Sequence, residues 1–194
     1  MSAMPGQERP AGSSVKLTYD DFVHFPDDGQ RHELIDGEHY VTPSPNLGHQ
    51  AIVGNLYFLI RQCLELHPVG RVFMAPLDVV LSNVDVVEPD LLYVSDARRA
   101  VLTPKHVRGA PDLVVEVGSP GTRRRDETIK RRLYEQWDVQ EYWVVDPDLE
   151  EVRVYRRQGE RYVRSALLSA EQGDVLTTAL LPGVSLALDR VFAQ

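Results

Sequence analysis

The stretch LVVEVGSPGTRRRDETIKRRLYEQWDVQEYWVV, residues 113–145, carries the clearest structural signal in the sequence. It begins with Leu113–Val117, a nearly continuous apolar run that is typical of a strand buried on both faces. A Gly-Ser-Pro-Gly sequence ends this strand, and a helix capped by Thr122 or Asp126 is expected to follow. A further strand over Glu141–Val145 closes the stretch, so this part of the chain alternates strand, helix and strand.

The flanking sequence predicts a long helix and several more strands. Leu47–Leu66 has apolar residues at helical spacing, and a histidine, a proline and a glycine close it. A hairpin is expected where Asp36-Gly37 separates two short strand-like runs. These two runs are Arg31–Ile35 and Glu38–Thr42. The remaining expected strands are Arg71–Leu81, Val86–Val94, Glu151–Arg157 and Arg161–Leu168. We therefore predict one mixed α/β domain over residues 15–194, preceded by a flexible lead-in over residues 1–14.

The composition fits one domain with a hydrophobic core. The chain has 194 residues, of which 43% are hydrophobic and 26% are charged, which excludes a disordered or fibrous protein. Its one cysteine, Cys63, excludes an internal disulfide and a site built from several thiolates. The sequence has no secretory signal pattern and no apolar run of the roughly 18 residues that a membrane helix needs. A soluble, cytoplasmic protein without membrane contact is expected.

The net charge of −8 argues against a broad nucleic-acid-binding surface, because such surfaces are basic. Any phosphate-binding surface must then be local. The one local concentration of basic residues follows the Leu113–Val117 strand and contains Arg123, Arg124, Arg125, Arg131 and Arg132. Contact with phosphate and a solvated, ion-paired face are equally good interpretations of it.

Two carboxylates interrupt apolar strands. Asp90 follows Pro89 within the expected strand Val86–Val94, and Glu116 lies inside LVVEV. A carboxylate in such a place costs several kcal/mol to desolvate unless it is paired or bound to a metal. On adjacent strands the two could hold one hard divalent cation, which prefers oxygen ligands. Asp112 lies roughly 13 Å along the strand from Glu116, too far to share that ion, and is expected instead to bond to backbone or to an arginine.

Lys130 is the third unusual residue. On the helix that is expected to end near Trp137, it lies on the apolar stripe with Asp126, Leu133 and Tyr134. Its stem could lie across these neighbours and reach water, or its ammonium could point at the strand glutamate. Two acids, a divalent ion and a lysine make a site for phosphodiester hydrolysis, in which the ammonium orients a water or stabilises charge in the transition state.

These residues resemble the PD-(D/E)xK superfamily of restriction-endonuclease-like nucleases and, more closely, the bacterial Uma family. The matching segments are HELIDGEHYVTPSPNLGHQAIVGNL (32–56), APLDVVL (75–81), VVEPDLLYV (86–94), GAPDLVVEVGSPGTRRRDETIKRRLYEQWDVQEYWVVDP (109–147) and LLPGVSL (180–186). The resemblance implies a restriction-endonuclease-like fold, a mixed central β-sheet flanked by helices. It also implies an endonuclease that needs Mg²⁺ or Mn²⁺ and cuts nucleic acid, DNA in particular. Analogy with such nucleases implies a homodimer.

Residue by residue, the resemblance implies metal binding by Asp90 and Glu116, with Glu33 as a further acid. The superfamily pattern has a lysine two residues after the glutamate, where this chain has Gly118. The resemblance allows that lysine to lie on the following helix, which assigns its catalytic role to Lys130. Taken without the resemblance, Glu33 could simply be a hairpin residue paired with an arginine.

Two further residues are candidates for auxiliary roles. His49 opens the long helix, where it could cap the helix, touch a phosphate or assist at the site, and a structural or capping role is favoured. Tyr134 lies near the Lys130 face and could support the site, although core packing is the better explanation. The other histidines show no zinc-ligand spacing.

Two other functions fit parts of the sequence. Because Gly118 replaces the motif lysine and the chain is acidic, a non-catalytic nuclease fold that binds DNA or a protein partner is the main alternative. A hydrolase that acts on sugars through two carboxylates is a weaker one, since it leaves Lys130 unexplained.

Overall fold

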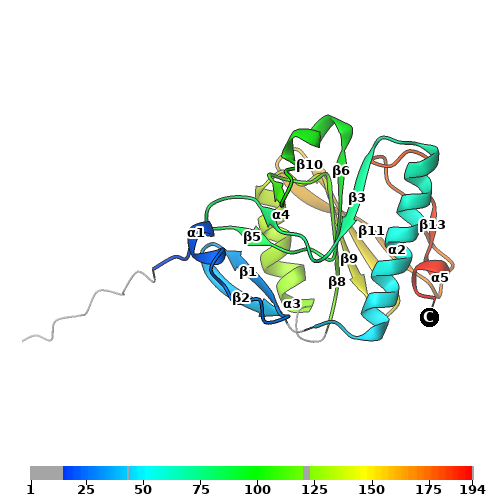
Figure 1. Cartoon of the computed structure of the whole chain (residues 1–194). Helices are drawn as coiled ribbons and strands as arrows, with labels where there is room; N and C mark the ends of the chain where they lie inside the picture. Colours follow the sequence, from blue (N-terminus) through cyan, green and yellow to red (C-terminus); the bar gives the residue numbers. More distant parts are fainter. Residues whose placement is uncertain (1–14, 43, 120–122, 194) are drawn as a thin grey trace, which may run out of the picture.

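The computed structural model describes residues 15–42, 44–119 and 123–193, so the expected lead-in and Thr122 lie outside the described residues. A six-stranded mixed sheet in the order β11-β10-β9-β8-β6-β3 forms its centre (Figure 1). Neighbouring strands are antiparallel except for β8 and β9, which are parallel. The strands are β3 (Gly70–Met74), β6 (Leu91–Ser95), β8 (Leu113–Val117), β9 (Glu141–Asp146), β10 (Glu151–Gln158) and β11 (Arg161–Ser169).

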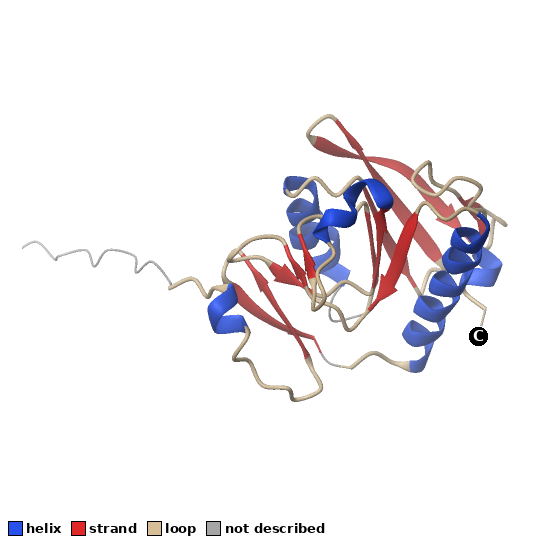
Figure 2. Cartoon of the chain, turned by 45° about the horizontal axis from the view of Figure 1, so that its top comes forward, coloured by secondary structure: helices blue, strands red, loops and turns tan. Residues whose placement is uncertain are grey.

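A second, smaller sheet lies beside the first and contains the expected hairpin around Asp36-Gly37 (Figure 2). Both turn residues have positive φ, which matches the turn chemistry of Asp-Gly. Its order is β2-β1-β5-β4-β7. The strands are β1 (Arg31–Ile35), β2 (Glu38–Thr42), β4 (Val79–Val80), β5 (Val86–Val87) and β7 (Val107–Arg108), and a separate pair is formed by β12 (Val175–Leu176) and β13 (Leu186–Ala187).

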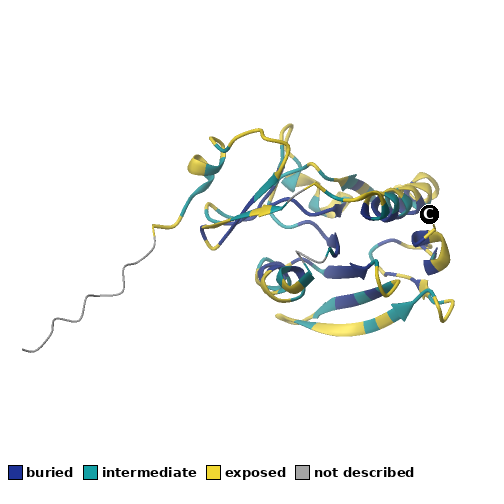
Figure 3. Cartoon of the chain, turned by 90° about the horizontal axis from the view of Figure 1, so that it is seen from below, coloured by how far each residue is buried: buried dark blue, intermediate teal, exposed yellow. Residues whose placement is uncertain are grey.

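Helices cover both faces of the central sheet. On one face α2 (Leu47–Leu66) and α5 (Leu188–Val191) pack on the side chains of Leu113 and Val115. On the other face the helical segment α3–η2–α4, residues 123–136, packs on Val114. Figure 3 shows the strands at the centre of this sheet as buried, where β8 and β9 lie, whereas the edge strand β11 is partly exposed. Because side chains alternate along a strand, Glu116 lies on the same face as Val114, under α3–η2–α4.

Other helices are short: α1 (Tyr19–Phe22) follows Thr18, and the 3-10 helix η1 (Asp96–Val101) follows β6. Over residues 15–42, 44–119 and 123–193, no helix combines the length and hydropathy that crossing a bilayer requires.

Two of the expected strands are each divided between the two sheets. The chain leaves β3 at Ala75-Pro76 and enters β4 only at Val79, and it leaves β5 at Glu88 and enters β6 at Leu91. The predictions of continuous strands over 71–81 and 86–94 are therefore wrong. Each break contains a proline, which lacks the N–H that a central strand must donate. Pro89-Asp90 consequently lies between two strands instead of inside one.

The expected helix after β8 is present but is not a uniform α-helix. It consists of α3 (Arg123–Arg125), one π-helical stretch η2 (Asp126–Lys130) and α4 (Arg131–Gln136). Asp126 lies within this run, so the prediction that it could cap the helix is wrong.

The expected bonding of Asp112 to the backbone is confirmed, because its carboxylate accepts a hydrogen bond from the Ser95 N–H at 2.6 Å.

Candidate active site

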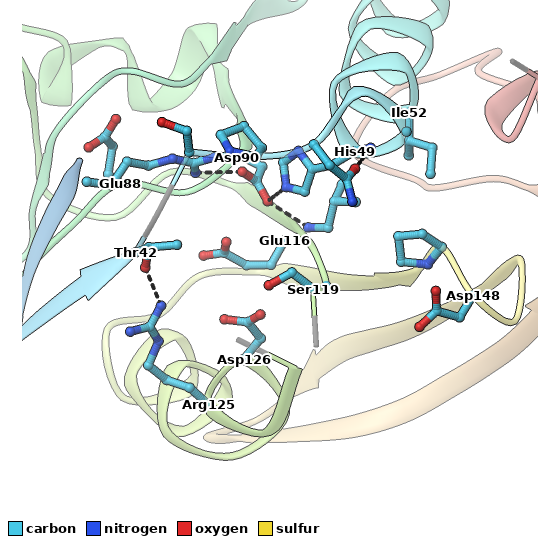
Figure 4. Close-up of a pocket in the computed structure, with 18 of the residues that line it drawn as sticks. Thr42, His49, Ile52, Glu88, Asp90, Glu116, Ser119, Arg125, Asp126 and Asp148 are labelled. Carbon is cyan, nitrogen blue, oxygen red and sulfur yellow. Dashed lines mark hydrogen bonds and ion pairs between the residues drawn. The ribbon is translucent and has the colours of Figure 1, made fainter. Parts of the chain in front are cut away.

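A cavity of about 790 Å³ lies where the β1–β2 hairpin, the start of α2, the end of β8 and the α3–η2 segment meet. Figure 4 shows side chains from these elements around one shared space. The sequence-predicted residues that line it are Glu33, His49, Asp90, Glu116, Arg125 and Lys130. The fold therefore brings side chains that lie up to 97 positions apart in the sequence to one place.

Lys130 lies between two buried glutamates. Its Nζ is 2.7 Å from Oε1 of Glu33 and 2.9 Å from Oε1 of Glu116, and the residue is 3% exposed. The π-helical stretch turns both Asp126 and Lys130 toward the interior, and such stretches are frequent at functional sites. Although burial alone would lower the pKa of Lys130, the charges of Glu116 and Glu33 raise it. The expected contact with Glu116 is thus present, and the interpretation in which the stem reaches water is wrong.

Glu116 accepts a second hydrogen bond at the same oxygen, from the hydroxyl of Tyr134 at 2.8 Å. Burial raises the pKa of Glu116 to about 8, although Lys130 opposes this shift. Tyr134 is fully buried, so it both packs in the core and contacts the site. The Glu116 carboxylate is consequently held in one position by a cation and a neutral donor.

Asp90 lies opposite the end of β8, because Leu91 of β6 pairs with Val115 of β8. Its Oδ1 accepts from Arg31 at 2.6 Å, and its Oδ2 accepts from the Val117 N–H at 2.8 Å and lies 3.1 Å from Nε2 of His49. Burial opposes ionisation of Asp90, but His49 and Arg31 hold its pKa below the usual value. Asp90 is therefore an ionised carboxylate with both oxygens engaged.

Sequence reasoning missed two residues of this region. Glu88 is 8% exposed, and burial raises its pKa to about 7. It interrupts a valine-rich run in the same way as Glu116 does, so the argument applied to Glu116 could have found it. Arg31 had no such signal, because an arginine at the start of a hairpin strand is ordinary.

His49 does not cap α2. The N-cap is Asn46, whose side chain accepts from the His49 N–H at 2.8 Å, so the capping interpretation is wrong. The His49 ring instead lies in the cavity wall against Asp90 (Figure 4). Its position on the first turn of α2 explains this contact, since that turn faces the cavity.

The three consecutive arginines have different environments. Arg123 donates to Asp146 at 2.8 Å, so its guanidinium is engaged inside the protein. Arg124 is exposed. Arg125 lines the cavity, donates to Thr42 Oγ1 at 2.6 Å and lies over the Tyr40 ring. Arg125 also lies 3.7 Å from Oε2 of the buried Glu33, so of the three only Arg124 could reach a phosphate without disturbing an ion pair inside the protein.

A divalent cation fits the cavity in donor type and charge. Among the residues that the structure describes, no group of three or more His, Cys, Asp or Glu side chains is placed so that it could hold a metal ion as it stands. However, seven of the described lining residues are acidic and three are Lys or Arg, and carboxylates are the ligands that Mg²⁺ prefers. In the described chain, Oε2 of Glu33 is buried without a hydrogen-bond partner, and its neighbouring cation is Arg125 at 3.7 Å. Binding at Asp90 and Glu116 would exchange contacts with Arg31 and Lys130 for contacts with the ion.

A known family matches most of the chain. The Uma2 family model, described as "Putative restriction endonuclease", matches residues 19–189. The chain belongs to the Uma2 family. Among solved structures it is similar to a "putative nuclease belonging to DUF820" from Anabaena variabilis, with 21% identity, coverage of 91% of this chain and 98% of that chain, and a TM-score of 0.76. This similarity confirms the expected restriction-endonuclease-like fold.

A further solved structure, the type IIG restriction endonuclease BpuSI, is similar at 14% identity over 66% of this chain and 15% of that chain, with a TM-score of 0.39. No curated protein matches the sequence. Membership of Uma2 does not assign roles to individual residues of this chain. Those roles are inferred from the geometry described above.

Proposed function

We propose that this protein is a divalent-metal-dependent endonuclease that hydrolyses phosphodiester bonds of nucleic acid, with DNA as its substrate. The observation that carries the proposal is the position of the Lys130 ammonium, buried between Glu33 and Glu116 in the wall of an open cavity. A lysine buried in this way has no packing advantage over an apolar residue, whereas a fixed positive charge beside carboxylates serves phosphoryl chemistry.

In the proposed site, Asp90 and Glu116 hold Mg²⁺ or Mn²⁺, and Glu33 assists them. A bound divalent ion polarises the phosphoryl oxygen and lowers the pKa of a bound water. Lys130 stabilises the negative charge that develops on the phosphate, or orients the attacking water through its N–H groups. Its compact ammonium suits this task better than the planar fork of an arginine. Tyr134 holds Glu116 in place through its hydroxyl.

The charge distribution supports binding to nucleic acid only near the cavity. The chain carries a net charge of −8, so the nucleic-acid backbone would be repelled by most of the surface. Arg125 lines the cavity and Arg124, its neighbour in the chain, is exposed, and contact of both with phosphates would make affinity depend on salt. By analogy with other nucleases of this fold, we also propose that the protein acts as a homodimer.

Cleavage assays with the purified full chain test this proposal. Supercoiled plasmid, single-stranded DNA and RNA are incubated with Mg²⁺ or Mn²⁺ and, separately, with EDTA. We expect metal-dependent cutting of DNA that is abolished in Asp90→Ala, Glu116→Ala and Lys130→Ala and kept in Lys105→Ala, which removes an exposed lysine outside the cavity.

Circular dichroism and thermal unfolding establish that each variant is folded. Absence of cleavage with every metal and substrate would overturn the proposal. Tight DNA or protein binding that Asp90→Ala leaves unchanged, without cleavage, would instead identify a non-catalytic nuclease fold.

A further inference from the structure

Two histidines of the β1–β2 hairpin face each other on the side of the hairpin away from the cavity. Nδ1 of His32 lies 2.9 Å from Nε2 of His39, and the two ring planes are 14° apart. His39 stands opposite Leu34 in the strand register. Because side chains alternate along a strand, both histidines share a face with Leu34, whereas Glu33 lines the cavity from the other face. The hairpin therefore joins two nitrogens whose seven-residue spacing is no zinc-ligand pattern in the sequence.

A carboxylate orients the first of these histidines. Nε2 of His32 lies 3.0 Å from Oδ1 of Asp28, and this hydrogen bond lowers the pKa of Asp28 from its usual value. An ionised carboxylate can only accept, so the bond assigns the His32 proton to Nε2 and leaves a lone pair on Nδ1, directed at His39. Metal-binding histidines almost always donate their other ring N–H to a carboxylate, a carbonyl or a water in this way. Asp28 is thus placed as the outer partner of a metal-binding histidine.

The surroundings shield the histidine pair on one side and leave it accessible on another. The centroid of the Phe25 ring lies 4.4 Å from that of His39 and 5.7 Å from that of His32. The His32 side chain is 10% exposed, whereas His39 is an exposed residue. Phe25 therefore packs apolar surface against both rings, and an ion can reach the pair from the solvent at His39.

We propose that Nδ1 of His32 and Nε2 of His39 bind a divalent transition-metal ion such as Zn²⁺, with Asp28 as the outer hydrogen-bond partner. Imidazole suits Zn²⁺, whereas the carboxylates of the cavity suit Mg²⁺ and Mn²⁺. Within the described chain no third His, Cys, Asp or Glu side chain completes the ligand set, so water molecules fill the remaining positions.

The observed distance is close to the one that such an ion requires. Two nitrogens bound to a tetrahedral Zn²⁺ at about 2.0–2.1 Å lie about 3.3 Å apart. The 2.9 Å between His32 and His39 must therefore widen slightly, and each ring must turn toward the ion. The exposed side chain of His39 has the freedom to make this adjustment.

An ion at the pair would link β1 to β2 on the hairpin that carries Glu33. It should stabilise the folded chain, because the unfolded chain does not hold the two nitrogens together. Neither Asp28 nor either histidine lines the cavity, so this inference does not rest on the proposed nuclease function.

Calorimetric titration of the full chain with Zn²⁺, in the presence of excess Mg²⁺, tests the site. We expect His39→Gln to bind one Zn²⁺ fewer than the wild type. Asp28→Asn should keep this ion but bind it about 10–100-fold more weakly, as when the outer partner of a metal-binding histidine is lost. The control variant His67→Gln, which removes an exposed histidine at the end of α2, should bind as the wild type does.

Thermal unfolding adds a second readout. Zn²⁺ should raise the midpoint of unfolding more in the wild type and in His67→Gln than in His39→Gln. In EDTA, His39→Gln should unfold as the wild type does, because His39 is exposed.

Equal numbers of bound Zn²⁺ ions in the wild type and in His39→Gln would overturn the inference, and so would a wild type that binds no Zn²⁺. Neither result would count against the proposed nuclease, whose ion is probed with Mn²⁺ and should be lost in Glu116→Gln and kept in His39→Gln.

Discussion

The ammonium of Lys130 lies 2.9 Å from Oε1 of Glu116, and both side chains are only 4% exposed. This contact joins the helical segment α3–η2–α4 to the centre of the main sheet. Glu116 belongs to β8, the strand that pairs with both β6 and β9. A buried central strand thus carries the carboxyl group, and a π-helical stretch carries the ammonium that faces it.

Removal of the Lys130 charge should destabilise the protein. Lys130→Met leaves Glu33 and Glu116 buried without their shared cation, and breaking a buried pair in this way costs about 3–5 kcal/mol. The loss should be smaller at pH 5 than at pH 9, because Glu116 can take up a proton at the lower pH. Urea unfolding at both pH values measures it. The double variant Lys130→Met/Glu116→Gln should recover part of the stability, and equal losses in the single and double variants would show that the two side chains are not coupled.

Stability of the metal-free protein should fall as the pH rises from about 5 to 8. Burial raises the pKa of Glu116 to about 8 and that of Glu88 to about 7, above their usual value of 4.5. The folded state therefore binds more protons than the unfolded state within this window. Each group contributes a slope of at most about 1.4 kcal/mol per pH unit.

Urea unfolding in EDTA between pH 5 and pH 8 measures this slope. Glu116→Gln should make it shallower, because an amide does not titrate. A stability that rises with pH in the wild type, or a slope that Glu116→Gln leaves unchanged, would contradict the assignment.

Arg31 should compete with a divalent ion for Asp90. Its guanidinium lies 2.6 Å from Oδ1 of Asp90, which is an oxygen that the proposed ion needs. Arg31→Met frees that oxygen and removes one positive charge, so Mn²⁺ affinity should rise about fivefold, on the order of the ~1 kcal/mol between unit charges 4 Å apart in water. Calorimetry measures the change. An unchanged or weaker affinity would mean that Arg31 positions Asp90 instead of shielding it.

Tyr134→Phe isolates the hydroxyl that holds Glu116. Phe fills the same space in the core, so the variant removes little besides the 2.8 Å hydrogen bond. The free energy of unfolding should fall by about 1.5–3 kcal/mol, as for hydrogen bonds to charged groups. Cleavage should fall less than in Lys130→Ala, because Tyr134 acts through Glu116. A variant with full stability and full activity would remove Tyr134 from the site.

Much of the fold could be predicted from local patterns. Leu47–Leu66 has a helical period and a clear end, and Asp36-Gly37 is a strong hairpin signal, so both elements agree with the structure. The divided strands could not be predicted from hydrophobicity. Val86–Val87 and Leu91–Ser95 are equally apolar but belong to different sheets, and only Pro89 marks the change.

Part of the candidate site could be predicted from the sequence, for a physical reason. Asp90, Glu116 and Lys130 stand out because burial of a charge among apolar residues is costly. The apolar neighbours that indicate this burial can be recognised in the sequence itself. Glu88 has the same signal beside Asp90, whereas Arg31 and the contact of His49 with Asp90 arise from tertiary packing alone. The resemblance to the Uma family was needed to single out Glu33, which sequence context alone left as an ordinary hairpin residue.

A crystal soaked in Mn²⁺ tests the central claim most directly, since anomalous scattering locates this ion without relying on catalysis. We expect a peak within bonding distance of the carboxylates of Asp90 and Glu116, with Lys130 still beside Glu116. At saturating Mn²⁺, an intact cavity with no anomalous peak at these two side chains would contradict a metal-dependent nuclease site.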